Sequence, residues 1–157
     1  MQQVSYNMLI ISIANPILLG VYKGDLLIES ISREGRTSEV LPSLFDELTS
    51  KYNIINIFYV NGPGSYMAIK IAYIFLKTIS IVNKINLFAV SGFDFNNNSP
   101  IKALGKKYFF RHNKLDNDNI TIEFLNNSFI QEFILPEKFM NIKYSEDTLP
   151  KYNLPAV

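Results

Sequence analysis

The chain has 157 residues and a net charge of +1, and 48% of its residues are hydrophobic. This is enough apolar material for one hydrophobic core, which excludes an intrinsically disordered chain. It has no cysteine and one histidine, which excludes disulfides, thiolate zinc sites and cysteine nucleophiles. The near-zero charge argues against a protein that binds nucleic acid over a broad basic surface.

The first third of the chain predicts three strands joined by tight turns. Apolar runs at 8–14, 17–22 and 26–32 are separated by Asn15-Pro16 and by a turn at 23–25. The first run is no secretory signal, because the first basic residue follows it instead of preceding it. We therefore expect an antiparallel meander in a soluble, cytoplasmic protein.

Helices and strands alternate in the next part of the chain. Helical spacing predicts an amphipathic helix at 38–50, and strands are expected at 55–62 and 86–92 with a helix at 66–82 between them. This alternation after a meander indicates an α/β fold, a mixed sheet with flanking helices.

An Asn-rich loop at 93–100 predicts a boundary between two lobes, residues 1–95 and 96–157. In the second lobe, 102–114 and 120–126 are predicted to be strands, and 128–139 allows a helical turn before Pro136.

A glycine-rich turn precedes the helix at 66–82, and it consists of Gly62, Pro63, Gly64 and Ser65. It lacks the lysine of GxxxxGK[ST] and the spacing of GxGxxG, although any helix N-terminus attracts anions. The structural interpretation is favoured: the glycines permit a sharp turn, and Ser65 caps the helix.

The helix at 66–82 is apolar on almost every side. The stripe expected to face the sheet comprises Ile69, Ala72, Phe75, Leu76, Ile79 and Val82. The second stripe comprises Met67, Lys70, Ile71, Ile74, Thr78 and Ile81, with Lys77 beside it. Either the rest of the chain covers this stripe, or it is a protein interface with the lysines at its rim. The two lysines argue against a membrane span.

A segment at 106–114 alternates basic and aromatic residues, which makes Lys106, Lys107 and Arg111 candidate RNA contacts. A half-buried, solvated strand is favoured, because both faces of such a strand are mixed. The acidic pairs of the sequence have no histidine near them, so we expect no catalytic residue and no metal site.

The order of elements and the segment NGPGSYMAIKIA resemble the bacterial TsaB (YeaZ-like) family over residues 8–95. The family motif, GRGPGSFTGxRIG, is matched at Gly62, Pro63, Gly64, Ser65 and Ile71. The stretches 33–44 and 87–95 resemble the family's first helix and a later strand, whereas the second lobe is shorter than usual.

This resemblance implies a ribonuclease-H-like fold of the actin, sugar-kinase and Hsp70 superfamily. It also implies a non-catalytic subunit without a cofactor, which activates a TsaD-type catalytic subunit by heterodimerisation. A TsaE-type ATPase is the third partner, and the complex forms threonylcarbamoyladenosine next to the anticodon of tRNA. The family pairs through the helix that follows GPGS, which assigns the second stripe to the partner. Alone, the chain is expected to form a homodimer through the same face, and tRNA is contacted only through the complex.

Two alternative functions remain open at this point. One is a small nucleotide-binding phosphotransferase-like enzyme of the same fold. Ser12-Ile13-Ala14 stands where the family usually has Asp-Thr-Ser. A serine hydroxyl binds magnesium less strongly than a carboxylate does. The phosphotransferase-like enzyme is therefore disfavoured. The other is an RNA-binding module that uses the three basic residues of 106–114. A protease, as older family names suggest, is disfavoured by the residue types present.

Overall fold

The computed structural model describes residues 3–117, 119–125 and 131–153. Every strand and helix expected in the first 95 residues is present, with ends shifted by at most three residues. Within the described residues the elements are β1 (Tyr6–Ile11), β2 (Ile17–Lys23), β3 (Leu26–Arg33), α1 (Thr37–Thr49), β4 (Ile54–Val60), α2 (Tyr66–Asn83), β5 (Asn86–Val90), the 3-10 helix η1 (Gly92–Phe95), β6 (Ile101–Leu104), β7 (Lys107–Arg111), β8 (Ile120–Phe124) and β9 (Tyr144–Ser145).

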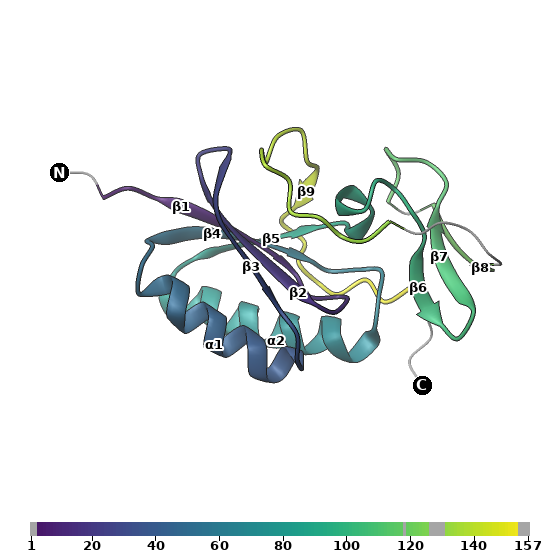
Figure 1. Ribbon diagram of the computed structural model, residues 1–157, viewed down its shortest axis with the longest axis horizontal. Coiled ribbons are helices and arrows are strands. Elements are labelled where there is room, and N and C mark those ends of the chain that lie inside the picture. Colours follow the sequence, from purple (N-terminus) through teal and green to yellow (C-terminus); the bar gives the residue numbers. More distant parts are fainter. Residues whose placement is uncertain (1–2, 118, 126–130, 154–157) are drawn as a thin grey trace.

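A six-stranded mixed sheet forms the main body, in the order β3-β2-β1-β4-β5-β9. The first three strands are the predicted antiparallel meander, and β1, β4 and β5 are parallel. The helices α1 and α2 lie side by side on one face of this sheet (Figure 1). The predicted α/β class is therefore confirmed. The core on this side joins Met8, Ile10 and Leu19 of the sheet to apolar residues of both helices.

The opposite face of the sheet is covered by an extended segment, residues 131–153, which we call the strap. Phe133, Leu135 and Phe139 of the strap pack against Leu9 and Phe58 of the sheet. Backbone hydrogen bonds fix the strap to the β2–β3 hairpin, including the amide of residue 139 to the carbonyl of residue 25 at 2.8 Å. In Figure 1 the part of the strap around β9 lies on the side of the sheet away from the helices, and the yellow end of the chain runs from there toward the first turn of α2.

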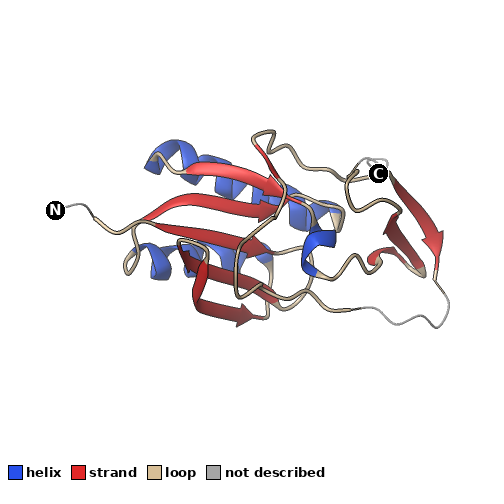
Figure 2. Cartoon of the chain, turned by 90° about the horizontal axis from the view of Figure 1, so that it is seen from above, coloured by secondary structure: helices blue, strands red, loops and turns tan. Residues whose placement is uncertain are grey.

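The small sheet consists of β6, β7 and β8 and lies at one end of the molecule (Figure 2). The expected single strand at 102–114 is wrong: it is a hairpin that turns at Gly105, whose φ is +59°. The strand expected at 120–126 is present as β8, and residue 126 lies outside the described residues.

The residues after 95 pack in two different places, and their division from the rest as a second lobe stays a prediction. The small sheet is separate, but the strap returns to the main body and adds β9 to the large sheet. The helical turn expected at 128–139 is absent from residues 131–135, and 128–130 lie outside the described residues. Ile134 is exposed while Phe133 and Leu135 are half-buried, so burial alternates as in an extended chain.

Candidate partner interface and glycine turn

The helix α2 has one face fixed to the protein. Ile69, Ala72 and Leu76 are fully buried, and Phe75 meets Phe45 of α1 edge-to-face with ring centroids 5.9 Å apart. These contacts confirm the sheet-facing stripe over most of its length. Val82 is an exception, because it is exposed in the last turn of the helix.

The second stripe of α2, which we call the outer stripe, faces solvent. Ile74 is 53% exposed and Ile81 is 69% exposed. The exposed residues are Met67, Lys70, Ile74, Lys77, Thr78 and Ile81, and Ile71 is half-buried. The interpretation in which α1 and the second lobe cover this stripe is therefore wrong for the described residues. A soluble monomer rarely leaves so many large apolar side chains on one helix face, so the outer stripe is the candidate binding surface.

The exposed charges of α2 are positive and those in the middle of α1 are negative. Lys70 and Lys77 are exposed and form no ion pair within the described part of the chain, although the Lys70 ammonium lies 5.8 Å from the centre of the Tyr66 ring. The solvent side of α1 carries Asp46 and Glu47. This arrangement is typical of an apolar interface centre with a charged rim.

By length and composition alone, α2 is also apolar enough to cross a membrane, and it is the one such helix in the described residues. Of its apolar window, 17% is buried inside the protein. The buried contacts of Ile69, Ala72 and Leu76 fix this helix to the sheet.

The glycine turn before α2 is packed against two other parts of the chain. Gly62 has φ +143°, and a Cβ atom on it would collide with the backbone carbonyl oxygen of Lys151 in the strap. A Cβ on Gly64 would come within 3.0 Å of the Cβ of Ile13. The absence of a side chain at Gly62 and Gly64 therefore lets Lys151 and Ile13 approach the backbone of the turn. This close packing is a structural role for the glycines in addition to the sharp turn.

Hydrogen bonds fix the strap to this turn. The Asn61 carbonyl accepts from the Lys151 amide at 2.8 Å, and the Asn61 side-chain amide donates to the Leu149 carbonyl at 2.9 Å. The Tyr59 hydroxyl donates to the Thr148 carbonyl. Burial raises the pKa of Tyr59, with smaller contributions from Tyr73 and other neighbours.

Ser65 occupies the N-cap position of α2, but its hydroxyl makes no capping hydrogen bond. The expected side-chain cap is therefore wrong. The sequence can indicate that a serine stands at the N-cap position. It cannot indicate whether the hydroxyl of that serine forms the capping hydrogen bond.

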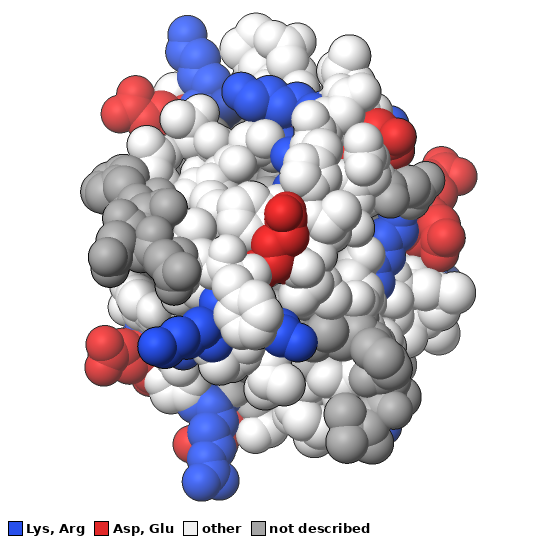
Figure 3. Space-filling view, turned by 90° about the vertical axis from the view of Figure 1, so that its right-hand side faces the viewer, with Lys and Arg blue, Asp and Glu red and all other residues white. Residues whose placement is uncertain are grey.

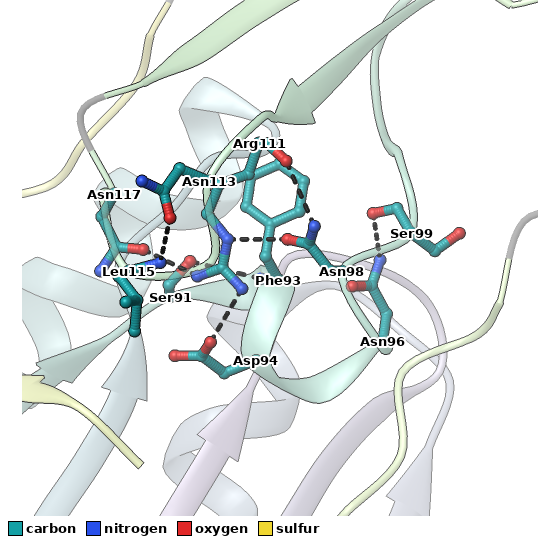
Figure 4. A network of polar contacts seen from close by, with 10 residues as sticks. All are labelled: Ser91, Phe93, Asp94, Asn96, Asn98, Ser99, Arg111, Asn113, Leu115 and Asn117. Atoms are coloured by element: carbon teal, nitrogen blue, oxygen red, sulfur yellow. Dashed lines mark hydrogen bonds and ion pairs between the residues drawn. The ribbon is translucent and has the colours of Figure 1, made fainter.

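Arg111 is buried and paired, which removes it from the candidate RNA contacts. Its side chain is 2% exposed, and a terminal guanidinium nitrogen lies 3.0 Å from a carboxylate oxygen of Asp94. The other guanidinium nitrogens donate to Asn98 at 2.7 Å and Asn117 at 2.8 Å (Figure 4). The guanidinium also lies 5.2 Å from the centre of the Phe93 ring. Arg111 therefore ties β7 to the 3-10 helix and to the loops beside it.

The other two candidate RNA contacts are exposed. Lys106 lies in the β6–β7 turn, and the Lys107 ammonium lies 5.4 Å from the centre of the Phe124 ring. Figure 3, which views the end of the molecule that carries the small sheet, shows basic and acidic side chains interspersed over that face. The two lysines are thus available to solvent.

No group of three or more histidine or acidic residues that could hold a metal ion occurs within the described residues. His112 is exposed, and its Nε2 lies 2.6 Å from the Thr121 hydroxyl and 3.4 Å from a carboxylate oxygen of Glu123. These contacts join neighbouring strands at the surface of the small sheet.

No protein-family model and no curated protein sequence matches this chain. Solved structures do match its fold. YeaZ from Pseudomonas aeruginosa is 10% identical with a TM-score of 0.59, over 81% of this chain and 67% of that protein. An uncharacterised protein with similarity to the peptidase YeaZ from Pseudomonas aeruginosa is 11% identical with a TM-score of 0.52, over 97% of this chain and 69% of that protein. The chain therefore has the ribonuclease-H-like fold of YeaZ proteins, which confirms the fold that the sequence resemblance implied.

Proposed function

We propose that this chain is a non-catalytic subunit that activates a TsaD-type catalytic subunit by binding it through the outer stripe of α2. In this proposal the pair works with a TsaE-type ATPase in the cytoplasm and forms threonylcarbamoyladenosine on tRNA. The exposed outer stripe carries the proposal, because it is a row of large apolar side chains on a helix whose other face is fixed. The fold shared with YeaZ supports this choice of family.

The residues present favour a binding role over catalysis. Ser12-Ile13-Ala14 follows β1 without a carboxylate. The glycine turn, where a related enzyme would approach a phosphate, is packed against the strap. Both observations count against the phosphotransferase alternative. The burial of Arg111 weakens the RNA-binding alternative, because it leaves two of its three basic residues.

The outer stripe supplies part of the area that a stable complex needs. A specific interface buries at least about 1,000 Å² in total, and each fully buried large aliphatic side chain contributes about 1.5–3 kcal/mol. Ile74 and Ile81 would form the centre, and Lys70 and Lys77 the rim. The solvent side of α1 is polar. We therefore expect α1 to contribute Asp46 and Glu47 to the charged rim of the interface and no apolar centre. An isologous homodimer would set this acidic rim against the lysines of a second copy.

The test is the molar mass in solution, measured by light scattering for this chain alone and mixed with the TsaD-type subunit of the same organism. The expected result is a homodimer that converts to a heterodimer. A chain that ignores the catalytic subunit would refute the proposal. A second result would also refute the proposal: the chain floats with anionic lipid vesicles and does not pair with the catalytic subunit. The outer stripe would then face a membrane.

A further inference from the structure

A cavity of about 470 Å³ lies where the small sheet, the strap and the turn between β1 and β2 meet. Ile13 and Leu18 line it from the main body, and Phe133 lines it from the strap. Lys102 of β6 and Tyr108 of β7, which are paired across their hairpin, line it from the small sheet. Cavities of this size with apolar walls and a few polar groups are typical sites for small organic molecules. This cavity is therefore a candidate ligand site.

Asn96, which also lines the cavity, has a hydrogen-bond acceptor without a donor. The residue directly follows η1 and is 2% exposed. Its side-chain nitrogen donates to the Ser99 carbonyl at 2.9 Å, whereas no donor reaches its Oδ1 atom (Figure 4). Among the residues that the structure describes, this oxygen is the one buried side-chain polar atom without a hydrogen-bond partner. Burial of an unpaired acceptor is unfavourable, so the oxygen indicates a ligand that carries a donor.

The strap side of the cavity can adjust to such a ligand. The Asn96 oxygen is shielded from solvent, so a donor reaches it only after a small movement of the lining. Gln131 and Phe133 of the strap are half-buried, and the side chain of Gln131 has no hydrogen-bond partner within the described part of the chain. The backbone here is fixed by hydrogen bonds from the amides of residues 131 and 134. Side chains of the strap can therefore turn while its backbone stays in place.

The lining favours an uncharged, flat ligand. It carries one basic residue, Lys102, and one acidic residue, Glu132, and both are exposed. These opposite charges leave no positive excess that would hold a phosphate or another strongly charged group. Tyr108 and Phe133 contribute aromatic rings, which pack well against a ring of the ligand.

We propose that this cavity binds an uncharged aromatic ring compound with one N–H group, and that this group donates to the Oδ1 atom of Asn96. The ring packs among the apolar side chains of the lining, such as Ile13 and Phe133. The cavity shares no residue with the outer stripe of α2, so this site is separate from the proposed partner interface.

The test is an amide NMR titration of the full chain with two probes of nearly the same shape, indole and benzofuran. Indole has a ring N–H group, and benzofuran has an oxygen atom in its place. Saturable shifts are expected for the amides of residues 13–15, 96 and 131–133. Indole is expected to bind about tenfold more tightly than benzofuran, which is the effect of one hydrogen bond. Equal binding of the two probes, or the absence of saturable shifts, would overturn the proposal.

Two serines of β3 provide a matched pair of variants that tests the location of the site. Ser30 and Ser32 are both exposed and lie on the same face of the strand, but Ser32 lines the cavity and Ser30 does not. Ser32→Trp is expected to fill the cavity and abolish indole binding, and Ser30→Trp is expected to leave it nearly unchanged. Equal effects of the two variants would place the binding elsewhere and overturn the proposal.

Asn96→Leu tests the acceptor, because leucine has a similar volume and no side-chain oxygen. The folded variant is expected to bind indole and benzofuran equally. A variant that keeps the tenfold preference for indole would overturn the assignment to Asn96. If this variant does not fold, the comparison of probes in the parent chain and the two serine variants decide the proposal.

Adenosine monophosphate tests whether the cavity instead takes a charged nucleotide. It is expected to bind more weakly than indole, because the lining has no excess of positive charge. Tighter binding of adenosine monophosphate than of indole, with shifts at the same amides, would overturn the assignment to an uncharged ligand.

Discussion

The backbone carbonyl oxygen of Lys151 lies in the space that a Cβ atom on Gly62 would occupy. The strap and the turn that begins α2 therefore fit together only through a glycine. The Lys151 amide donates to the carbonyl of the preceding residue, Asn61, which holds the strap at this distance. The first glycine of the GPGS turn thus serves a contact with the far end of the chain.

The first prediction follows from this contact. Gly62→Ala is expected to lower the free energy of unfolding by about 3 kcal/mol, because the methyl group meets backbone and the φ of +143° strains any L-residue. Urea unfolding followed by circular dichroism measures this loss.

The matched control is Gly24→Ala, at a glycine with φ +59° and no atom within 4 Å of the added Cβ. It carries the backbone strain without the collision, so its expected loss is about 1 kcal/mol. Equal losses for the two variants would mean that the strap yields freely and that its contact with the turn is weak.

Local periodicity explains why the first 95 residues were predictable. The burial of β4 and the two faces of α2 are both encoded in residues that are neighbours in sequence. The match of GPGS to a family motif located the turn, and the exposed Ile74 agrees with the outer stripe read from helical spacing.

The strap and the Arg111 network could not be read in this way. Arg111 lies between aromatic residues in a basic segment, and its partner Asp94 lies in a different predicted lobe. The contact of Lys151 with Gly62 joins residues from opposite ends of the sequence. Long-range pairs of this kind leave no periodic signal, so the pattern indicated solvent where the structure has a buried ion pair.

The second prediction concerns Arg111 as a structural residue. Arg111→Met leaves Asp94 without its buried partner, and breaking such a pair costs about 3 kcal/mol of unfolding free energy. Chemical denaturation measures this loss, and amide exchange in β6–β8 reports whether the small sheet opens first.

Lys106→Met is the matched control for charge, because Lys106 is exposed in a turn. Its stability is expected to stay within about 0.5 kcal/mol of the parent chain. A stable Arg111→Met variant that lost affinity for RNA would restore Arg111 as a nucleic-acid contact.

The third prediction is a loss of stability in alkali. Burial raises the pKa of both Tyr22 and Tyr59 above the ordinary value of 10 for tyrosine. The unfolded chain therefore releases these protons at lower pH than the folded chain does. Their stabilisation is complete below pH 10 and is lost as pH rises above it. Thermal unfolding measured from pH 8 to pH 11 is expected to show a melting temperature that falls above pH 10.

Tyr59→Phe separates this effect from general alkaline damage. It removes the hydrogen bond to the Thr148 carbonyl, at a cost of about 1 kcal/mol near neutral pH, and it also removes one titrating group. The fall above pH 10 is then expected to be shallower than in the parent chain. Tyr144→Phe, at an exposed tyrosine, is the control, and an equally shallow fall in both variants would contradict the assignment to Tyr59.

The fourth prediction tests the outer stripe directly. Ile74→Glu is expected to abolish homodimer formation and binding to the TsaD-type subunit, because it places a charge at the centre of an apolar interface. Its unfolding free energy is expected to stay close to that of the parent chain, since Ile74 is 53% exposed. Leu76→Glu is the comparison, because this fully buried residue of the same helix would carry a charge into the core and unfold the protein. Light scattering and urea unfolding of the two variants distinguish the faces. An unfolded Ile74→Glu chain would place this residue in the core, and a folded chain that still pairs would move the interface away from α2.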